Sequence, residues 1–104
     1  MVAALIHFEN GVKGHIGASR VTWGRKCGLR WELHGTEGTI MYDQERLNEL
    51  KLFTRQDNPA TDGFRTILTG PLHEPYAAFL PNGGHSLGYM DVKICELHGL
   101  LSAI

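Results

Sequence analysis

Short stretches of alternating apolar and polar residues, separated by turn signals, constrain this sequence more than any other feature. Residues 2–8 and 12–19 alternate in this way on either side of Asn10-Gly11, a dipeptide suited to the positive backbone angles of a tight hairpin turn. A period of two places every second side chain on the same face of a strand. The pattern therefore predicts an antiparallel β-hairpin over the first residues of the chain.

Four further segments with the same period extend the predicted sheet. They are residues 29–34, 39–42, 49–53 and 64–68. In the first of them, Trp31 and Leu33 lie on one face while Glu32 lies on the other, so one side of the sheet is expected to be buried and the other wetter. Polar residues 54–63 predict a surface loop. The three prolines within residues 70–84 predict an extended arm over the surface, without ladder pairing.

The last part of the chain changes to the period of a helix. Apolar residues recur there at intervals of three and four: Met90, Ile94, Leu97, Leu101 and Ile104. This spacing predicts a helix over residues 87–104, with Ser86 as its N-cap and the apolar stripe covering one sheet face. The expected fold class is therefore α+β, a predominantly antiparallel open β-sheet with one C-terminal helix packed on it, in a single domain of residues 1–104.

Composition and charge argue against several classes of function. Ten basic and eleven acidic residues give the 104-residue chain a formal charge of −1, which provides no strong field for a nucleic acid or a membrane surface. No apolar run approaches the roughly 20 residues that span a bilayer, and the first residues do not read as a signal peptide. Cys27 and Cys95 fit neither a disulfide framework nor a CxxC metal site. We therefore expect a reducing, cytoplasmic compartment.

Two local motifs offer alternative chemistries. Residues 84–88 read GHSLG, which matches the G-x-S-x-G elbow of serine hydrolases. That elbow needs a strand leading into it, whereas Pro81 interrupts the approach, and the available Asp91 and His98 share one predicted helix instead of converging on the serine. Cys95 and His98 are three residues apart on that helix, but a structural zinc site needs four ligands. We therefore predict neither a hydrolase nor a metal site.

Three segments, taken in order, resemble a known family. They read GTEGTIMYDQERLNELKLF at residues 35–53, GFRTILTGP at residues 63–71 and GHSLGYMDVKICE at residues 84–96. Together they resemble the C-terminal domain of the Gfo/Idh/MocA oxidoreductases, and within that family an inositol 2-dehydrogenase-like subgroup. The resemblance runs over nearly the whole chain.

This resemblance implies a two-domain parent. An N-terminal Rossmann domain would bind NAD or NADP, and the second domain would shape the site for a sugar or polyol and form homo-oligomer contacts through its sheet. The chain matches a part of the second domain only, because the G-x-G-x-x-G loop of a Rossmann domain and the family's catalytic lysine have no counterpart in it. We therefore expect a domain truncated at both ends, with no catalytic, cofactor-binding or metal-binding residue. The alternative is a stand-alone oligomeric binding or assembly module without enzymatic activity.

Five residues are candidates for the wall of the parent's substrate pocket. In relatives, the loop around residues 23–28 and the start of the last helix approach the sugar, which implies the candidates Trp23, Arg25, His85, Tyr89 and Lys93. A polyol offers hydroxyl groups for hydrogen bonding and an apolar ring face for stacking, which suits aromatic and basic side chains. The alternative interpretation makes Trp23 and Tyr89 packing residues and leaves the three basic side chains solvated.

Overall fold

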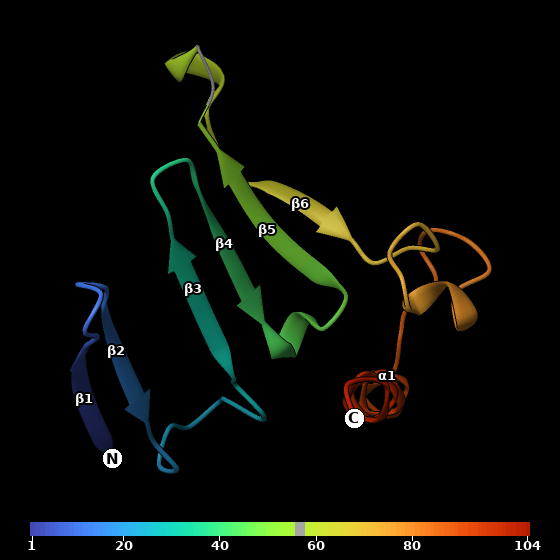
Figure 1. The fold of residues 1–104 in the computed structure, drawn as a ribbon, viewed down its shortest axis with the longest axis horizontal. Helices are drawn as coiled ribbons and strands as arrows, with labels where there is room; N and C mark the ends of the chain where they lie inside the picture. Colours follow the sequence, from blue (N-terminus) through green and yellow to red (C-terminus); the bar gives the residue numbers. More distant parts are fainter. Residues whose placement is uncertain (56–57) are drawn as a thin grey trace.

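Two antiparallel sheets and one C-terminal helix make up the computed structural model, which describes residues 1–55 and 58–104 (Figure 1). The first sheet is the hairpin of β1 (Val2–His7) and β2 (Lys13–Ala18). The second sheet contains β3 (Arg30–His34), β4 (Gly38–Asp43), β5 (Glu49–Thr54) and β6 (Arg65–Leu68), paired in chain order. The helix α1 spans Tyr89–Ser102. The predicted α+β class and the antiparallel pairing are confirmed.

The single broad sheet that we expected is divided in the structure. β2 and β3 belong to different sheets, and Figure 1 shows the hairpin standing apart from the four-stranded sheet. Residues 19–29 between them form turns and bends, and Gly24 has a φ of +87°. The chain therefore reverses and bends at the point where a continuous sheet would need β2 and β3 side by side. Alternation predicts strands, but it does not specify which strands pair.

The first hairpin has the predicted strands but a different turn. β1 and β2 remain in register as far as His7 and Lys13, so residues 8–12 form the connection. Gly11 has a φ of +85°, whereas no residue other than glycine has a positive φ in the described chain. The side chain of Asn10 accepts a hydrogen bond from a backbone amide two residues ahead, at 3.2 Å. The Asn-Gly pair thus shapes a longer loop with one left-handed glycine instead of a two-residue turn.

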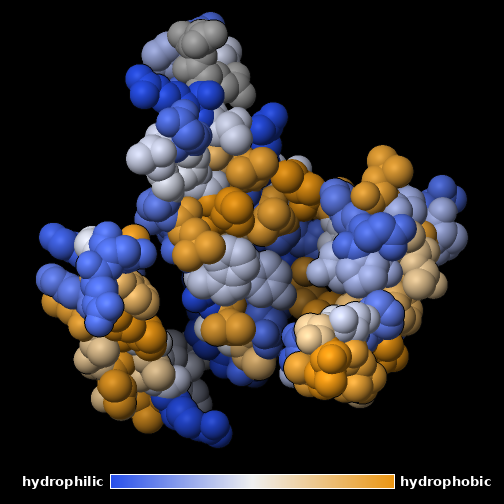
Figure 2. All heavy atoms as spheres, viewed as in Figure 1, coloured by the Kyte–Doolittle hydropathy of each residue, from blue (hydrophilic) through white to orange (hydrophobic). Residues whose placement is uncertain are grey.

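The register of the four-stranded sheet gathers the apolar positions on one face. Trp31 lies opposite Tyr42, and Leu33 lies opposite Ile40. On the next strand, Leu52 also lies opposite Ile40. Directly opposed residues of an antiparallel pair project from the same face, so these five side chains share one surface. Figure 2 shows apolar side chains gathered over this sheet.

The most buried side chains belong to the segment that connects β6 to α1. Residues 70–84 contain no strand, as their prolines predict, but they form turns and the 3-10 helix η3 (Tyr76–Ala78) instead of an extended arm. Leu80 and Leu87 are 2% and 5% exposed. The side chain of Asn48, which directly precedes β5, accepts a hydrogen bond from the backbone N of Leu87 (2.7 Å) and donates one to its carbonyl oxygen (3.0 Å). This pair of hydrogen bonds anchors the segment before α1 to the sheet.

The helix begins later than predicted and is capped by a different residue. The carboxylate of Asp91 accepts a hydrogen bond from the backbone N of Gly88 (2.8 Å), and Gly88 occupies the N-cap position. The prediction of Ser86 as the N-cap is therefore wrong. Gly88 needs no side chain here, because Asp91 reaches back to bond the N-cap amide and its charge is favourable near the positive end of the helix dipole.

The helix also turns a different face to the sheet than its periodicity predicts. All members of the predicted stripe are at least half exposed: Met90, Ile94, Leu97, Leu101 and Ile104. Val92 and Cys95 are half-buried instead. Periodicity predicts that a helix has an apolar face but does not specify which surface that face meets. At the start of the helix, the side chain of Asn48 bonds the backbone of Leu87 just before the first turn. Figure 2 shows the apolar atoms of the helix at the molecular surface.

The predicted polar loop between β5 and β6 contains one regular turn. The 3-10 helix η2 spans Pro59–Thr61, and the side chain of Asn58 accepts a hydrogen bond from the backbone N of Ala60. Residues 56–57, which belong to the same predicted loop, lie outside the described residues. η2 lies beyond the end of β5, away from α1 (Figure 1).

Candidate functional site

A groove lies between the apolar face of the four-stranded sheet and the start of α1. It encloses about 340 Å³, and its walls include Trp31 and Tyr42 from the sheet, Tyr76 from η3, and Tyr89 and Lys93 from α1. The rings of Trp31 and Tyr42 stack, with centroids 5.6 Å apart and planes inclined by 30°. We refer to these five residues as the aromatic groove. Its aromatic walls come from three segments that are distant in the sequence.

Hydrogen bonding and burial raise the pKa values of two polar groups in the aromatic groove. Lys93 Nζ lies 2.7 Å from Glu96 Oε2 and 5.2 Å from the centre of the Tyr89 ring. The hydrogen bond to Glu96 raises the pKa of the Lys93 ammonium. Burial raises the pKa of the Tyr42 hydroxyl, and the neighbouring Tyr76 adds to the effect. The groove therefore combines a neutral phenol, a cation and ring faces, which suits a neutral ligand rich in hydroxyl groups.

The structure brings together two of the five predicted substrate contacts. Tyr89 and Lys93 lie one helical turn apart in the aromatic groove. Trp23 and Arg25 lie in the connection between β2 and β3, where the Trp23 side chain is 98% exposed. His85 is exposed in the loop before α1. None of these last three lines the groove, and their role in substrate contact stays a prediction.

The sequence analysis missed the sheet side of the groove. The alternation of residues 29–34 assigns Trp31 to the apolar face, and no role in binding is predicted for it or for Tyr42. A usable signal was present, because Trp31 and Tyr42 occupy apolar positions in the alternating patterns of consecutive strands. The short reversal at residues 35–38 brings those two strands into direct register. For Tyr76 we find no comparable signal, because its position depends on the path of the irregular segment that carries it.

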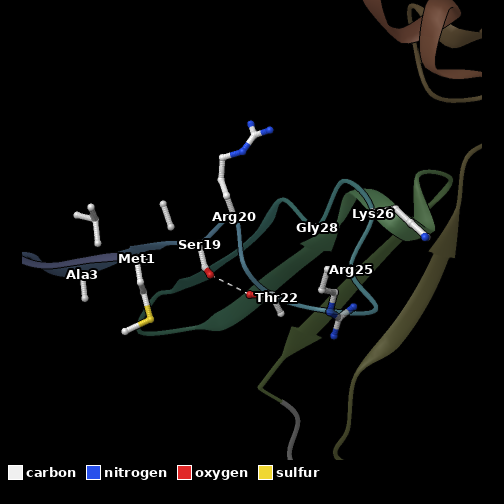
Figure 3. Close-up of a pocket in the computed structure, with 11 residues that line it drawn as sticks. Met1, Ala3, Ser19, Arg20, Thr22, Arg25, Lys26 and Gly28 are labelled. Carbon is white, nitrogen blue, oxygen red and sulfur yellow. Dashed lines mark hydrogen bonds between the residues drawn. The ribbon is translucent and has the colours of Figure 1, made fainter.

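A second hollow, of about 580 Å³, lies along the connection between β2 and β3 (Figure 3). Its lining includes the basic residues Arg20, Arg25 and Lys26. Figure 3 shows these three side chains pointing in different directions, so their charges do not converge on one point. The hydroxyls of Ser19 and Thr22 bond each other at 3.0 Å. The three positive charges are therefore spread along the hollow.

The alternative chemistries receive no support from the geometry. Residues 84–88 lie in a loop that follows η3, and Leu87 within it is buried, so the G-x-S-x-G match is not at a turn from a strand into a helix. Cys27 and Cys95 are both free thiols. Over residues 1–55 and 58–104, no three His, Cys, Asp or Glu side chains are grouped as metal ligands. Over the same residues, no helix has the length and apolar character to cross a membrane.

Comparison with known proteins identifies the fold. Residues 1–41 match the family model described as the GFO/IDH/MocA C-terminal domain. Over 104 residues the chain is 40% identical to levoglucosan dehydrogenase from Pseudarthrobacter phenanthrenivorans, covering 99% of this chain and 26% of that protein. The chain has the Gfo/Idh/MocA C-terminal domain fold. It is a homologue of levoglucosan dehydrogenase.

Solved structures agree with this assignment. A levoglucosan dehydrogenase in complex with NADH and levoglucosan has a TM-score of 0.83 and 40% identity, covering 93% of this chain and 26% of that one. An NAD-binding oxidoreductase from Klebsiella pneumoniae has a TM-score of 0.78 and 44% identity, covering 90% of this chain and 26% of that one. The chain therefore spans about a quarter of the length of these relatives. The predicted Gfo/Idh/MocA C-terminal domain fold is confirmed, whereas the inositol 2-dehydrogenase-like subgroup stays a prediction.

Proposed function

We propose that this chain forms part of the substrate-side wall of an NAD-dependent sugar dehydrogenase and is not catalytic by itself. The observation that carries the proposal is the aromatic groove, in which Tyr89 and Lys93 face the stacked rings of Trp31 and Tyr42. The family relationship supports it, because related structures contain NADH together with levoglucosan or with L-sorbose. Both are neutral hydroxylated compounds, the class of ligand that the chemistry of the groove suits.

Each part of the aromatic groove has a separate task in this proposal. The stacked Trp31 and Tyr42 rings, with Tyr89 opposite, provide apolar faces for the C–H side of a sugar ring. The Lys93 ammonium donates hydrogen bonds to sugar hydroxyls, and its bond to Glu96 keeps it charged and limits its rotamers. The Tyr42 hydroxyl keeps its proton at neutral pH and therefore both donates and accepts, and burial raises its pKa further. Together these groups orient a sugar without reacting with it.

The chemical step in the whole protein is assigned to groups outside this chain. In a dehydrogenase of this class, NAD accepts a hydride from a sugar or cyclitol carbon. We propose that a separate Rossmann domain binds the cofactor and supplies the proton acceptor, while the groove fixes which sugar carbon faces the nicotinamide. A cyclitol of the inositol type remains among the proposed substrates. The two free thiols support a reducing, cytoplasmic location.

A chimeric enzyme tests this proposal directly. The stretch of the Pseudarthrobacter phenanthrenivorans levoglucosan dehydrogenase that corresponds to residues 1–104 is replaced by this chain, and NADH formation is measured with levoglucosan, L-sorbose and myo-inositol. We expect turnover with at least one of these compounds, and none from the isolated chain. A chimera that folds and binds NADH but oxidises none of them would contradict the proposal.

Variants of the chimera locate the binding surface. Replacing Tyr89 with Ala or Lys93 with Met should raise KM for the accepted sugar by roughly tenfold, which corresponds to about 1.4 kcal/mol of lost binding. The matched control is Lys51→Met, because Lys51 lies on the opposite face of the sheet, where Nζ bonds Thr66 Oγ1. A KM that changes equally in all three variants would assign the effect to general charge or stability, and not to the aromatic groove.

A stand-alone oligomeric module is the second candidate, and exposed apolar side chains favour it. Leu33 on the sheet is 62% exposed, and the stripe along α1 is exposed as well. Apolar surface of this kind drives association when it forms a contiguous patch. We propose that the chain forms homo-oligomers through the sheet in either case. Light scattering at micromolar concentration should find species above 11.6 kDa, and Leu33→Lys should reduce them, whereas Leu72→Lys, at a position 94% exposed, should not.

A further inference from the structure

The connection between β2 and β3 is fixed by a cluster of contacts to the turn before β5. Residues 19–29 contain no strand or helix. The 3-10 helix η1 (Gln44–Arg46) lies beside them. Glu45 Oε2 accepts a hydrogen bond from Arg25 Nη1 at 2.6 Å, and Glu45 Oε1 accepts one from the backbone N of Lys26 at 2.7 Å. One carboxylate thus bonds both a side chain and the main chain of the connection.

A neighbouring residue of η1 adds two contacts to the same connection. Gln44 Nε2 lies 2.8 Å from Cys27 Sγ, and the backbone N of Gln44 donates to the carbonyl oxygen of Leu29 at 2.9 Å. We refer to Gln44 and Glu45 with these bonds as the η1 clamp. Gln44 and Leu29 also line the aromatic groove. The clamp therefore joins the connection that carries Trp23 to a wall of the groove.

The charge of Glu45 strengthens the hydrogen bonds of the η1 clamp. The carboxylate of Glu45 has a lowered pKa because it accepts hydrogen bonds from the Lys26 amide and from Arg25, so it is ionised near neutral pH. Hydrogen bonds to an ionised acceptor are shorter and stronger than neutral ones. Trp23 lies two residues before Arg25, next to Gly24, whose φ of +87° bends the chain there. Trp23 is 98% exposed, so packing does not hold this part of the connection, and the bonds of the η1 clamp are what fix its backbone.

We infer that Glu45 is a positioning residue, which holds the connection between β2 and β3 so that Leu29 keeps its place in the wall of the aromatic groove. The inference rests on the proposed function, because it takes the aromatic groove as the sugar site. It assigns to Glu45 no contact with the substrate. Without the η1 clamp, the connection would have to become ordered when the sugar binds. The entropy lost in that ordering would weaken the affinity for the sugar.

Nuclear magnetic resonance of the chain tests the clamp without any enzyme assay. In Glu45→Gln, the backbone order parameters of residues 22–27 should fall from about 0.85 to below about 0.6. The matched control is Glu49→Gln: Glu49 pairs with Arg46 at 2.6 Å, as Glu45 pairs with Arg25, and the two carboxylate side chains are similarly exposed, at 22% and 24%. Unchanged order in Glu45→Gln, or equal loosening in the control, would overturn the inference.

Kinetics of the chimeric dehydrogenase test the link to the sugar. Glu45→Gln should raise KM by roughly threefold to tenfold with kcat unchanged, the factor expected when binding must first order one or two side chains. Glu49→Gln should leave KM unchanged, because Glu49 pairs with Arg46 of η1. A loosened connection with unchanged KM, or an equal rise in KM in Glu49→Gln, would overturn the positioning role. A wild-type chimera without any activity would count against the proposed function, while the order parameters would still decide the clamp.

Discussion

The hydrogen bonds of Asn48 to Leu87 allow a sharp prediction about stability. Asn48 makes both bonds with its side chain, at 2.7 and 3.0 Å, and both are partly buried. Asn48→Ala removes the two bonds together and leaves the backbone N–H and C=O of Leu87 unpaired beside the buried Leu87 side chain, which is 5% exposed. Each net bond contributes about 1 kcal/mol, so the free energy of unfolding should fall by about 2 kcal/mol, and by up to about 3 if the unpaired groups find no water.

Urea denaturation followed by circular dichroism measures this change, and thermal denaturation provides a second reading. For a chain of this length, a loss of about 2 kcal/mol lowers Tm by about 8–16 °C. Asn58→Ala is the matched control: Asn58 makes one exposed bond, to the backbone N of Ala60 at 3.0 Å, so its loss should cost about 1 kcal/mol or less. If Asn48→Ala destabilises the chain no more than the control does, the anchor of α1 to the sheet is not where we place it.

Three further predictions concern burial and ionisation. Leu80→Ala should lower the free energy of unfolding in urea by about 2–5 kcal/mol, whereas Leu72→Ala, 94% exposed, should change it by less than about 0.5 kcal/mol. The hydrogen bond from Arg30 lowers the pKa of Asp43; its stabilising effect is present above the unfolded pKa of about 3.9 and is lost as pH falls through the folded value. Asp43→Asn should therefore flatten the acid side of the stability profile. Burial raises the pKa of Tyr42, so the free energy of unfolding should fall as pH rises past about 10. The fall should be less steep in Tyr42→Phe, and equal slopes in the two proteins would refute this prediction.

Strand positions could be predicted from this sequence because the alternation of apolar and polar residues is also what gives each strand one apolar and one polar face. Trp31 and Leu33 alternate with Glu32 in the sequence, and β3 places the first two on the face that β4 completes. The division into two sheets could not be predicted, since alternation carries no information about the partner strand. It depends on the bends of residues 19–29, where Gly24 has a positive φ.

The candidate site was predicted in part, for a related reason. Tyr89 and Lys93 were found by resemblance, and their spacing of four residues on a helix places them together. The sheet side of the aromatic groove depends on the register of Trp31 with Tyr42 and on the rotation of α1 about its axis. Contacts such as Asn48 with Leu87, between positions 39 residues apart, join the segment before α1 to the sheet. No local pattern in the sequence reports a bond of that separation.

The exposed helical stripe shows what a hydrophobic period can and cannot decide. The intervals of Met90, Ile94 and Leu97 correctly predict a helix with one apolar face, but the structure turns the half-buried Val92 toward the sheet and leaves that stripe in water. Two faces of α1 therefore have different tasks: one closes the aromatic groove through Tyr89 and Lys93, and the other remains free for association. Apolar side chains on a helix lower the free energy of the folded protein only when another surface covers them. The stripe therefore stabilises the protein only where it is covered. Variants of Ile94 should consequently affect self-association more than the stability of the monomer, and the reverse should hold for Val92.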